Sequence, residues 1–571
     1  MENTTKPICR DLVQLLVAHG VKKAFLSPGT RNAPLLVAIA RCQEISASVV
    51  VDERSAAFMA LGYASVANEP VAIICTSGTA LLNYAPAVAE AYYRKVPLIV
   101  ISADRPMEWI DQDDSQTLRQ PGALSNFVKG SYDIPDNDSD ETLWYASRVV
   151  NDALLLATTG RRAPVHINLQ LNDPLGLTAE FPPAAPKIIN LLNPREDLTV
   201  SCARELGCMI ASPRKVMIVA GFNPPDKRLN QALSKLARLP NFIVLTETVS
   251  NLHGKDFVPD IDTVLSAMSK EERQAFAPHV VITLGGALVS RFVKQYLRDI
   301  HPAEHWHVGL NHTTVDCFRS LTLRVEMDPG IFFMQLASAM QPHRSQSDYS
   351  DSWHIMANRA DSTRKAYISH APWSDLKAFS VMLPMIGNSV NLQLSNGTPV
   401  RYAQILAPFG YHRCDCNRGV SGIDGSTSTA VGASMAYNGR LTLLITGDLS
   451  AQYDVGAFAS LRLSPLLRIV VICNGGGGIF RFISTTSSLP ELEDYFTTNS
   501  AASLPLHELA AGYGADFFEV SDEHQLRSAW SVFMNPLSGR AAIMQINTPP
   551  EESAEVLKGF FHRADYLKHK K

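Results

Sequence analysis

The sequence has no uninterrupted apolar run near the roughly 18 to 20 residues that a membrane-spanning helix requires. Its start lacks a basic segment leading into an apolar one, so we expect no secretory leader and a cytoplasmic location. The nine cysteines are scattered and form no C-x-x-C pair, which argues for reduced thiols and against a disulfide framework or a zinc site. With a formal net charge of −4, the chain also lacks the basic excess typical of proteins that coat nucleic acid.

Two familiar phosphate-binding loops are missing as well. The four glycines Gly475–Gly478 do not form a G-x-G-x-x-G pattern, and no Gly-Lys-Ser or Gly-Lys-Thr follows them. What is present, 46% hydrophobic and 19% charged residues, is typical of a soluble globular protein. A chain of 571 residues is too long for one compact core and predicts about three or four cores.

Short runs rich in Val and Ile alternate with stretches of helical spacing, such as Ser55–Val66. Runs that are apolar on both faces are typical of parallel strands covered by helices on both sides. We therefore predict an α/β fold with parallel sheets. The predicted strands are Val49–Val51, Val71–Ile74, Leu98–Ile101, Val165–Leu169, Val216–Ala220, Phe242–Leu245, Val280–Leu284, Leu441–Ile445, Ile469–Cys473 and Ala541–Ile546.

Two changes in composition divide the chain. Prolines gather in Phe181–Pro186, where they prevent regular backbone hydrogen bonding and indicate a linker. A polar stretch begins at Gln341, and apolar periodicity returns near Leu376. We predict three α/β domains, at residues 1–182, 183–345 and 346–571.

Two strand-like runs of the last predicted domain end in oxygen-bearing side chains. Gly447 and Asp448 follow the first of these runs, and Asn474 follows the second. Ligands of an open parallel sheet bind at the carboxyl ends of its strands, so Asp448 and Asn474 can meet there. A carboxylate, an amide oxygen and a glycine carbonyl are hard ligands that suit Mg²⁺. The alternative is that Asp448 caps a helix and that the glycines form an ordinary loop.

A second acidic feature lies in the first predicted domain. Asp52 and Glu53 follow the run Val49–Val51, and a helix of small residues follows them. Either Glu53 has a chemical role, or Asp52 caps the helix and Glu53 stabilises its N-terminus. The residues alone leave both interpretations open.

Taken together, the glutamate after a first-domain strand and the Gly-Asp…Asn arrangement resemble the thiamine-diphosphate-dependent enzymes. Such enzymes have pyrimidine-binding, central and diphosphate-binding domains in this order. Within that superfamily the chain most resembles the 2-succinyl-5-enolpyruvyl-6-hydroxy-3-cyclohexene-1-carboxylate synthases of menaquinone biosynthesis. The resemblance covers nearly the whole chain and is carried by Ser27–Pro34, Thr76–Ala80, Ser102–Pro106, Gln116–Gln120 and Asn417–Gly425.

The resemblance implies thiamine diphosphate and Mg²⁺ as cofactors, with Mn²⁺ able to replace Mg²⁺. It implies that Glu53 forms a hydrogen bond with the pyrimidine ring, and that Arg31 and Gln116 are further catalytic residues. The metal ligands it implies are Asp448, Asn474 and the carbonyl of Gly476. The cofactor-binding residues it implies are Glu53, Gly387, Asn388, Ser389, Ser421, Ile423, Gly447, Asp448, Ser450, Asn474 and Phe480.

The implied reaction decarboxylates 2-oxoglutarate and adds the resulting succinyl carbanion equivalent to isochorismate, giving 2-succinyl-5-enolpyruvyl-6-hydroxy-3-cyclohexene-1-carboxylate and CO₂. Both substrates carry two carboxylates, so the site needs several cations, preferably arginines that form paired N–H bonds. Two positions depart from the family pattern. Ser290 stands where members of the family can carry a lysine, and Gln393 stands where they can carry an arginine. The implied substrate-binding residues are Thr30, Arg31, Arg105, Ser115, Gln116, Arg291, Gln393 and Arg418.

Two other functions remain open. Another enzyme of the same cofactor class, such as an acetolactate synthase, would act on pyruvate, whose single carboxylate does not need four arginines. A non-catalytic cofactor-binding regulator would have no need to keep Glu53, Asp448 and Asn474 together. The resemblance further implies a homodimer or a dimer of dimers, because the glutamate and the metal-binding aspartate of one site come from different subunits.

Overall fold

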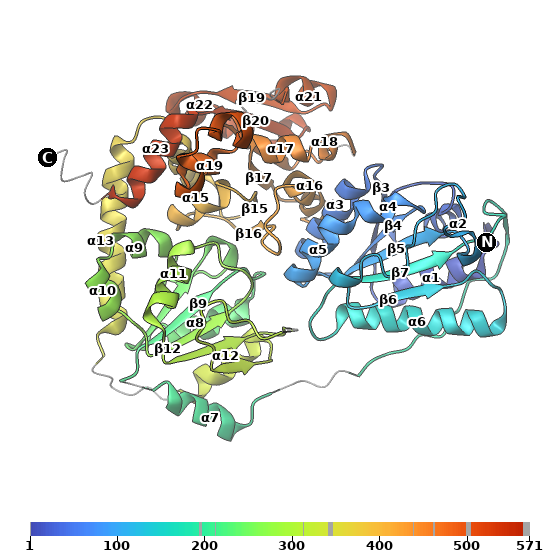
Figure 1. Ribbon diagram of the computed structural model, residues 1–571, viewed down its shortest axis with the longest axis horizontal. Coiled ribbons are helices and arrows are strands. Elements are labelled where there is room, and N and C mark those ends of the chain that lie inside the picture. The colour runs from blue at the N-terminus through green and yellow to red at the C-terminus, as the bar shows by residue number, and fades with distance from the viewer. Residues whose placement is uncertain are drawn as a thin grey trace.

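Three parallel β-sheets form the framework of the protein in the computed structural model (Figure 1). Each of these sheets has six strands. The structure describes residues 2–192, 197–211, 213–311, 313–340, 347–437, 439–460, 463–497 and 504–563. Within these ranges, no helix combines the length and the apolar character needed to cross a membrane. The predicted α/β class with parallel sheets is confirmed.

The first sheet has the strand order β3-β2-β4-β5-β7-β6, and a two-stranded ribbon of β1 and β8 lies beside it. Its inner strands β2, β4, β5 and β7 are buried, whereas the edge strand β3 is largely exposed. The elements of this N-terminal unit are β1 (Glu2–Thr4), α1 (Pro7–Ala18), β2 (Lys23–Leu26), α2 (Ala33–Ala40), β3 (Ser46–Val49), α3 (Glu53–Ala67), β4 (Val71–Cys75), α4 (Thr79–Asn83), α5 (Ala85–Arg94), β5 (Leu98–Asp104), β6 (Ser131–Ile134), α6 (Asp140–Thr158), β7 (Val165–Gln170) and β8 (Thr178–Glu180).

The central sheet has the order β11-β10-β9-β12-β13-β14. Its strands β9, β10 and β12 are uniformly buried, in agreement with the apolar runs that predicted them. The central unit consists of α7 (Val200–Met209), β9 (Val216–Ala220), α8 (Lys227–Leu236), β10 (Phe242–Thr246), β11 (Phe257–Val258), α9 (Ile261–Ala267), α10 (Lys270–Ala275), β12 (Val280–Leu284), α11 (Arg291–Ile300), β13 (Glu304–Val308), β14 (Leu323–Val325) and α12 (Pro329–Ala339).

The last sheet has the order β16-β15-β17-β18-β20-β19. Renumbered from one in chain order, its strands follow the sequence 2-1-3-4-6-5, and the first sheet follows the same sequence. The last unit consists of α13 (Tyr349–His370), α14 (Asp375–Met382), β15 (Asn391–Leu394), α15 (Pro399–Ile405), β16 (Arg413–Cys416), α16 (Ser426–Ala436), β17 (Thr442–Gly447), α17 (Asp448–Tyr453), α18 (Gly456–Ser460), β18 (Leu467–Cys473), α19 (Gly478–Phe482), α20 (Ser484–Ser487), α21 (Leu506–Gly512), β19 (Asp516–Val520), α22 (Glu523–Phe533), β20 (Ala542–Asn547) and α23 (Pro550–Phe561).

The predicted strands are present, with shifts at their ends. The largest shift concerns Val49–Val51, because β3 ends at Val49 and Val51 is exposed. The helix predicted at Ser55–Val66 is α3. Strands β15 and β16 were not predicted, although they lie at one side of the last sheet and determine which loops reach its functional edge.

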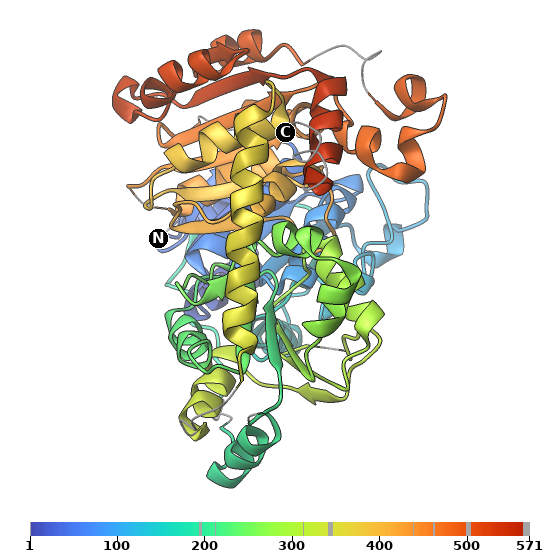
Figure 2. The same cartoon turned by 90° about the vertical axis from the view of Figure 1, so that its left-hand side faces the viewer.

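The predicted domain boundaries stay predictions. The first, at residue 182, follows β8, whose pairing with β1 keeps the chain attached to the N-terminal unit up to Glu180. The second, at residue 345, lies outside the described residues. The helix α13, which comes next, runs along both the central and the last units (Figure 2). Its residues Tyr349 and Trp353 pack in a core of the central unit, whereas Tyr367 packs in the core of the last unit.

Helices α3 and α16 pack at very short distance and join the N-terminal unit to the last unit. A Cβ atom placed on Gly62 would lie 1.9 Å from the carbonyl oxygen of Thr429, and one on Gly432 would lie 1.8 Å from that of Met59. Only glycine permits backbones to approach so closely. One continuous hydrophobic core therefore includes Phe58 of the N-terminal unit and Ala430 of the last unit.

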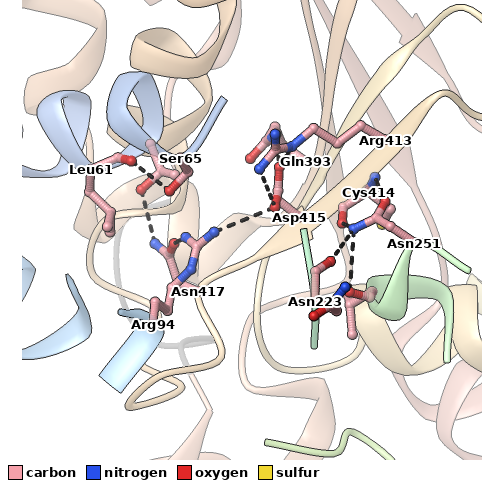
Figure 3. Close-up of polar contacts among 12 residues, drawn as sticks. Leu61, Ser65, Arg94, Asn223, Asn251, Gln393, Arg413, Cys414, Asp415 and Asn417 are labelled. Atoms are coloured by element: carbon pink, nitrogen blue, oxygen red, sulfur yellow. Dashed lines mark hydrogen bonds and ion pairs between the residues drawn. The ribbon is translucent and has the colours of Figure 1, made fainter. Parts of the chain in front are cut away.

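Buried polar contacts strengthen the same junction (Figure 3). Arg94 of α5 donates through Nη1 to Oδ1 of Asn417 at 2.9 Å, and its Nη2 lies 3.5 Å from Oδ1 of Asp415. Glu90, one turn earlier, accepts hydrogen bonds from the backbone N–H groups of Gly419 (2.7 Å) and Val420 (2.6 Å). Helix α5 thus fixes the loop that follows β16.

We predict that Gly62→Ala destabilises the protein by about 1–3 kcal/mol or more, because the added methyl group meets a backbone atom that cannot move independently. Urea unfolding followed by circular dichroism measures this change. Gly512→Ala is the matched control, since a Cβ there meets nothing within 4 Å. Equal stabilities of the two variants would contradict the proposed tight contact.

Candidate active site

The carboxyl edge of the first sheet collects the site residues predicted in the N-terminal unit. Thr30 and Arg31 follow β2, Glu53 begins the helix after β3, and Arg105 follows β5. The carboxyl ends of parallel strands lie at one edge of the sheet, so these residues gather at that edge. Burial lowers the pKa of Arg31, and the positive charge of Arg105 lowers it further.

The loop after β5 is held in place by these same side chains. Arg105 pairs through Nη1 with Oδ2 of Asp114 at 3.1 Å and donates through Nη2 to the carbonyl of Ser115 at 3.0 Å. Gln116 adopts a left-handed conformation (φ 59°) and donates to the carbonyl of Ser77 at 3.1 Å. Arg31 donates to the carbonyl of Leu171 at 2.8 Å. The structure thus brings Thr30, Arg31, Arg105, Ser115 and Gln116 to one rim.

Asp52, the neighbour of Glu53, caps the helix that Glu53 begins. Asp52 accepts hydrogen bonds from the backbone N–H groups of Arg54 (3.0 Å) and Ser55 (3.4 Å), so the capping interpretation is correct for Asp52. Glu53 is half-buried, and burial raises its pKa, with a smaller contribution from the charge of Asp52. A carboxyl group with a raised pKa is suited to share a proton with a ligand.

At the carboxyl edge of the last sheet, the predicted metal ligands lie together. Oδ2 of Asp448 accepts hydrogen bonds from the backbone N–H groups of Asn474 (3.1 Å) and Gly476 (2.9 Å), and Oδ1 accepts one from Leu449 (2.7 Å). The three glycines Gly475–Gly477 have positive φ angles, which wrap this loop around the carboxylate. Asp448 is also the first residue of α17, so the start of this helix is joined to the glycine loop after β18.

The remaining donor atoms suit a hard cation. Asn474 donates through Nδ2 to Oδ2 of the buried Asp375 at 2.8 Å, which turns its amide oxygen to the other side. Arg481 donates to the carbonyl of Gly476 at 3.1 Å and forms two 2.9 Å contacts with Glu493. A carboxylate, an amide oxygen and a fixed carbonyl form the oxygen set that Mg²⁺ prefers. The residues present therefore fit this metal.

Other predicted cofactor residues lie around this edge. Ser450 of α17 donates its hydroxyl hydrogen to the carbonyl of Ile423 at 2.8 Å. Gly447 is the last residue of β17, and Ser421 lies in the loop before α16 with a φ of 70°. Phe480 of α19 contacts the ring of Phe496, with 5.7 Å between ring centres.

Three predicted cofactor residues lie elsewhere and are corrected. Gly387, Asn388 and Ser389 precede β15 and are exposed, so they lie at the amino edge of the sheet, opposite Asp448. The loop that follows β15 at the correct edge is Ser395–Thr398. Its Asn396 donates to the carbonyls of Asn417 (2.6 Å) and Gly422 (2.7 Å), which ties this loop to the loop after β16.

The prediction that Gln393 contacts a substrate is also corrected. Gln393 lies inside β15, where its amide donates to Oδ1 of Asn391 at 2.9 Å and to Oδ2 of Asp415 at 3.3 Å (Figure 3). Asp415 is itself paired with Arg413 and Arg94. Gln393 thus belongs to a buried polar network at the domain junction.

A cation that the sequence analysis missed joins the predicted Arg291 and Arg418. Arg401 lies in the first turns of α15, and its pKa is lowered to about 10 by burial and by the charges of Arg291 and Arg418. The Nε atoms of Arg401 and Arg418 are buried and have no hydrogen-bond partner among the described residues. Arg418 donates to Oδ1 of Asn396 at 2.9 Å and to the carbonyl of Leu288 at 3.3 Å. The loop before Arg291 and the loops after β15 and β16 therefore bring the three guanidinium groups together at the carboxyl edge of the last sheet.

The carboxyl groups of Glu247 and Asp262 lie near these cations and accept hydrogen bonds from backbone N–H groups and from a hydroxyl group. Glu247 accepts hydrogen bonds from the N–H groups of Val289 (2.8 Å) and Ser290 (2.7 Å), and burial raises its pKa to about 7. Asp262 accepts a hydrogen bond from the hydroxyl of Ser290, and burial raises its pKa to about 6. Ser290 therefore anchors the start of α11 and holds Arg291 in position.

Comparisons with known proteins agree with this geometry. Residues 8–123 match the family model described as "Thiamine pyrophosphate enzyme, N-terminal TPP binding domain". The 2-succinyl-5-enolpyruvyl-6-hydroxy-3-cyclohexene-1-carboxylate synthase of Porphyromonas gingivalis is 39% identical over 559 residues, which cover 96% of each chain. The chain belongs to this synthase family.

Two further synthases of that name show the same extent of similarity. The one from Bacteroides fragilis is 37% identical and the one from Flavobacterium johnsoniae is 34% identical, each over 97% of this chain and 98% of its own. The similarity to the synthase family therefore includes all three sheets. Arg31, Glu53 and Arg105 lie in the segment that the thiamine pyrophosphate family model matches.

We predict that Asp448→Ala strongly weakens thiamine diphosphate binding in the presence of Mg²⁺, because water replaces a charged metal ligand poorly. Isothermal titration calorimetry measures the affinity. Asn388→Ala is the control and should bind the cofactor like the wild type, since Asn388 lies at the opposite edge of the sheet. A loss in Asn388→Ala, or none in Asp448→Ala, would contradict the assignment of the edges.

Proposed function

We propose that the protein catalyses the thiamine-diphosphate-dependent decarboxylation of 2-oxoglutarate and the addition of the succinyl group to isochorismate. The products are 2-succinyl-5-enolpyruvyl-6-hydroxy-3-cyclohexene-1-carboxylate and CO₂. The relatives are named as synthases of this carboxylate. The observation that carries this proposal is the convergence of Arg291, Arg401 and Arg418 beside the metal edge. Arg401 and Arg418 are partly buried, and together with Arg291 they outnumber the two nearby carboxyl groups of Glu247 and Asp262, so the cluster calls for an anionic ligand.

Thiamine diphosphate supplies the nucleophilic carbon and the electron sink for decarboxylation when it is bound. Asp448, Asn474 and the carbonyl of Gly476 would hold Mg²⁺, or Mn²⁺ in its place. The loop Ser395–Thr398 and the predicted residues Ser421, Gly447 and Ser450 are the groups we assign to the diphosphate end. Ile423 and Phe480 provide apolar surface for the rings.

Glu53 is assigned to the pyrimidine end of the cofactor. Its raised pKa supports a role in which the carboxyl group shares a proton with a ring nitrogen. Asp52 performs the capping of α3, so Glu53 is not required for that purpose. Arg31 and Gln116 are kept as catalytic residues because they line the same sheet edge.

The cations fall into two groups that suit two dianionic substrates. Arg401 and Arg418 belong to the unit that carries the metal ligands, so we assign them to 2-oxoglutarate, which must react beside the cofactor. Arg105 belongs to the first sheet and Arg291 to the central unit, and we assign these two to isochorismate. Thr30, Arg31, Ser115 and Gln116 are assigned to the same substrate region.

We predict that Arg401→Ala and Arg418→Ala lower CO₂ release from 2-oxoglutarate, whereas Arg105→Ala and Arg291→Ala spare it and lower formation of the isochorismate adduct. Each charge-assisted contact contributes on the order of 1.5 to 3 kcal/mol, so the loss in kcat/KM should be about 10-fold to 100-fold. Incubation with thiamine diphosphate, Mg²⁺ and both substrates, with CO₂ and the adduct assayed separately, measures the two steps. Equal losses of both steps in all four variants would overturn the assignment.

Two alternatives make different demands on the site. An acetolactate synthase would release CO₂ from pyruvate and would not require the cations around Arg401. Replacement of 2-oxoglutarate by pyruvate in the assay therefore separates the two enzymes. A cofactor-binding regulator would retain thiamine diphosphate without turnover of either acid.

We infer a homodimer as the working unit, alone or paired into a tetramer, and a cytoplasmic location. Exposed apolar side chains around the edge support the dimer: Val49 and Val51, just before Glu53, are 55% and 77% exposed, and Val420, beside Arg418, is 55% exposed. Apolar groups that flank charged site residues are typical of surfaces covered by a partner. A second copy of the chain would shield them from water.

We predict that Glu53→Gln and Asp448→Ala, each inactive alone, regain partial activity when co-expressed. If the two residues of one site come from different subunits, a mixed dimer contains one site with both residues intact. Differently tagged chains allow the mixed dimers to be purified before assay. Mixed dimers without activity would indicate that each site is built within one chain.

A further inference from the structure

Asp375 lies directly behind the metal loop without being one of the expected ligands. It is the first residue of α14 and is only 2% exposed. Its Oδ2 accepts a hydrogen bond from Nδ2 of Asn474 at 2.8 Å, and its Oδ1 accepts one from the hydroxyl of Thr548 at 2.6 Å. Its backbone N–H donates to Oγ of Ser553 at 3.0 Å. The carboxylate is thus held rigidly by segments far apart in the sequence.

The side chain of Asn474 has two ends of almost equal shape, and only one of them can bind a cation. The amide oxygen is a ligand, whereas the NH₂ group repels a metal ion. A rotation of the amide by half a turn exchanges these two ends. Something other than shape must therefore select the orientation that binds the metal.

The backbone of the loop is fixed by other contacts and leaves this choice open. Oδ2 of Asp448 holds the N–H groups of Asn474 and Gly476, and Arg481 donates to the carbonyls of the same two residues at 3.3 and 3.1 Å. None of these contacts involves the amide group of the Asn474 side chain. The hydrogen bond to Asp375 does, and an ionised carboxylate can only accept.

We propose that Asp375 is a positioning residue that sets the amide of Asn474 with its oxygen toward the metal. This role rests on the proposed function, since it deepens the Mg²⁺ site assigned there. The carboxylate of Asp375 accepts from Nδ2 of Asn474, so Oδ1 of the same amide is directed away from Asp375 and is left for the metal. Residues that orient a ligand in this way commonly change metal affinity by about 10-fold to 100-fold when they are replaced.

The test uses the full-length protein saturated with thiamine diphosphate and titrated with Mn²⁺, with free Mn²⁺ followed by electron paramagnetic resonance. Asp375→Asn should weaken Mn²⁺ binding by about 10-fold to 100-fold, because an amide at 375 can also donate and so permits the reversed orientation. Thr548→Val is the matched control. It removes a partner of Asp375 and leaves the contact with Asn474, so it should bind Mn²⁺ within about twofold of the wild type.

A second pair of variants, made in an Asn474→Asp protein, separates the effect of Asp375 on the orientation of residue 474 from the effect of its negative charge. In Asn474→Asp both ends of the side chain are oxygens, so no orientation has to be selected. Asp375→Asn should then cause no loss of Mn²⁺ affinity in that background, although it removes the same negative charge, because the amide at 375 donates to the carboxylate at 474 and relieves the repulsion between two facing carboxylates. This comparison also serves if Asp375→Asn alone is too unstable to purify. Thermal unfolding without metal reports on structural damage in each variant.

The outcomes distinguish this inference from the function on which it rests. Equal losses from Asp375→Asn in both backgrounds would show that Asp375 acts through its charge or through the fold, and would overturn the inference alone. Unchanged affinity in Asp375→Asn would do the same. A wild type that binds thiamine diphosphate but no Mn²⁺ would overturn the metal site itself, and the role of Asp375 with it.

Discussion

The close packing of α3 against α16 is the constraint on which the placement of the site depends. Because Gly62 and Gly432 bring two backbones together, helix α5 of the N-terminal unit reaches the loop after β16. There Glu90 binds the N–H groups that follow Arg418, so a substrate-binding candidate of the last unit is positioned from the first. A bulkier residue at the crossing would displace both units and every side chain at their edges.

The candidate site divides its tasks between two sheets of equal strand order. The first sheet presents a carboxyl group of raised pKa, Glu53, together with Arg31 and Arg105. The last sheet presents Asp448 and the glycine loop, with arginines close by. In both sheets the residues stand at the carboxyl ends of parallel strands, the edge at which open parallel sheets bind their ligands.

Much of the fold could be predicted from the sequence, because strands such as β9, β10 and β12 are apolar on both faces. Asp448 and Asn474 could be predicted as neighbours for the same reason, since each follows an apolar strand. Strands β15 and β16 escaped prediction because they bury polar side chains: Gln393 pairs with Asp415 across them. Without β15, the loop Ser395–Thr398 and Arg401 could not be assigned to the functional edge, and Gly387–Ser389 were assigned instead.

Helix α13 has a mechanical consequence for the enzyme. Its first turns are embedded in the central unit through Trp353, while Tyr367 near its end is embedded in the last unit and donates to the carbonyl of Val556 at 2.8 Å. Between them Arg364 donates to the backbone carbonyls of Ile405, the last residue of α15, and of Ala407 just after it. A rotation of the central unit against the last unit would break these contacts of α13. The distance between Arg291 and the arginines of the last unit is therefore fixed before any substrate binds. The cation assigned to isochorismate and the two assigned to 2-oxoglutarate thus keep a constant separation, so the fold itself would set how far apart the two bound acids lie.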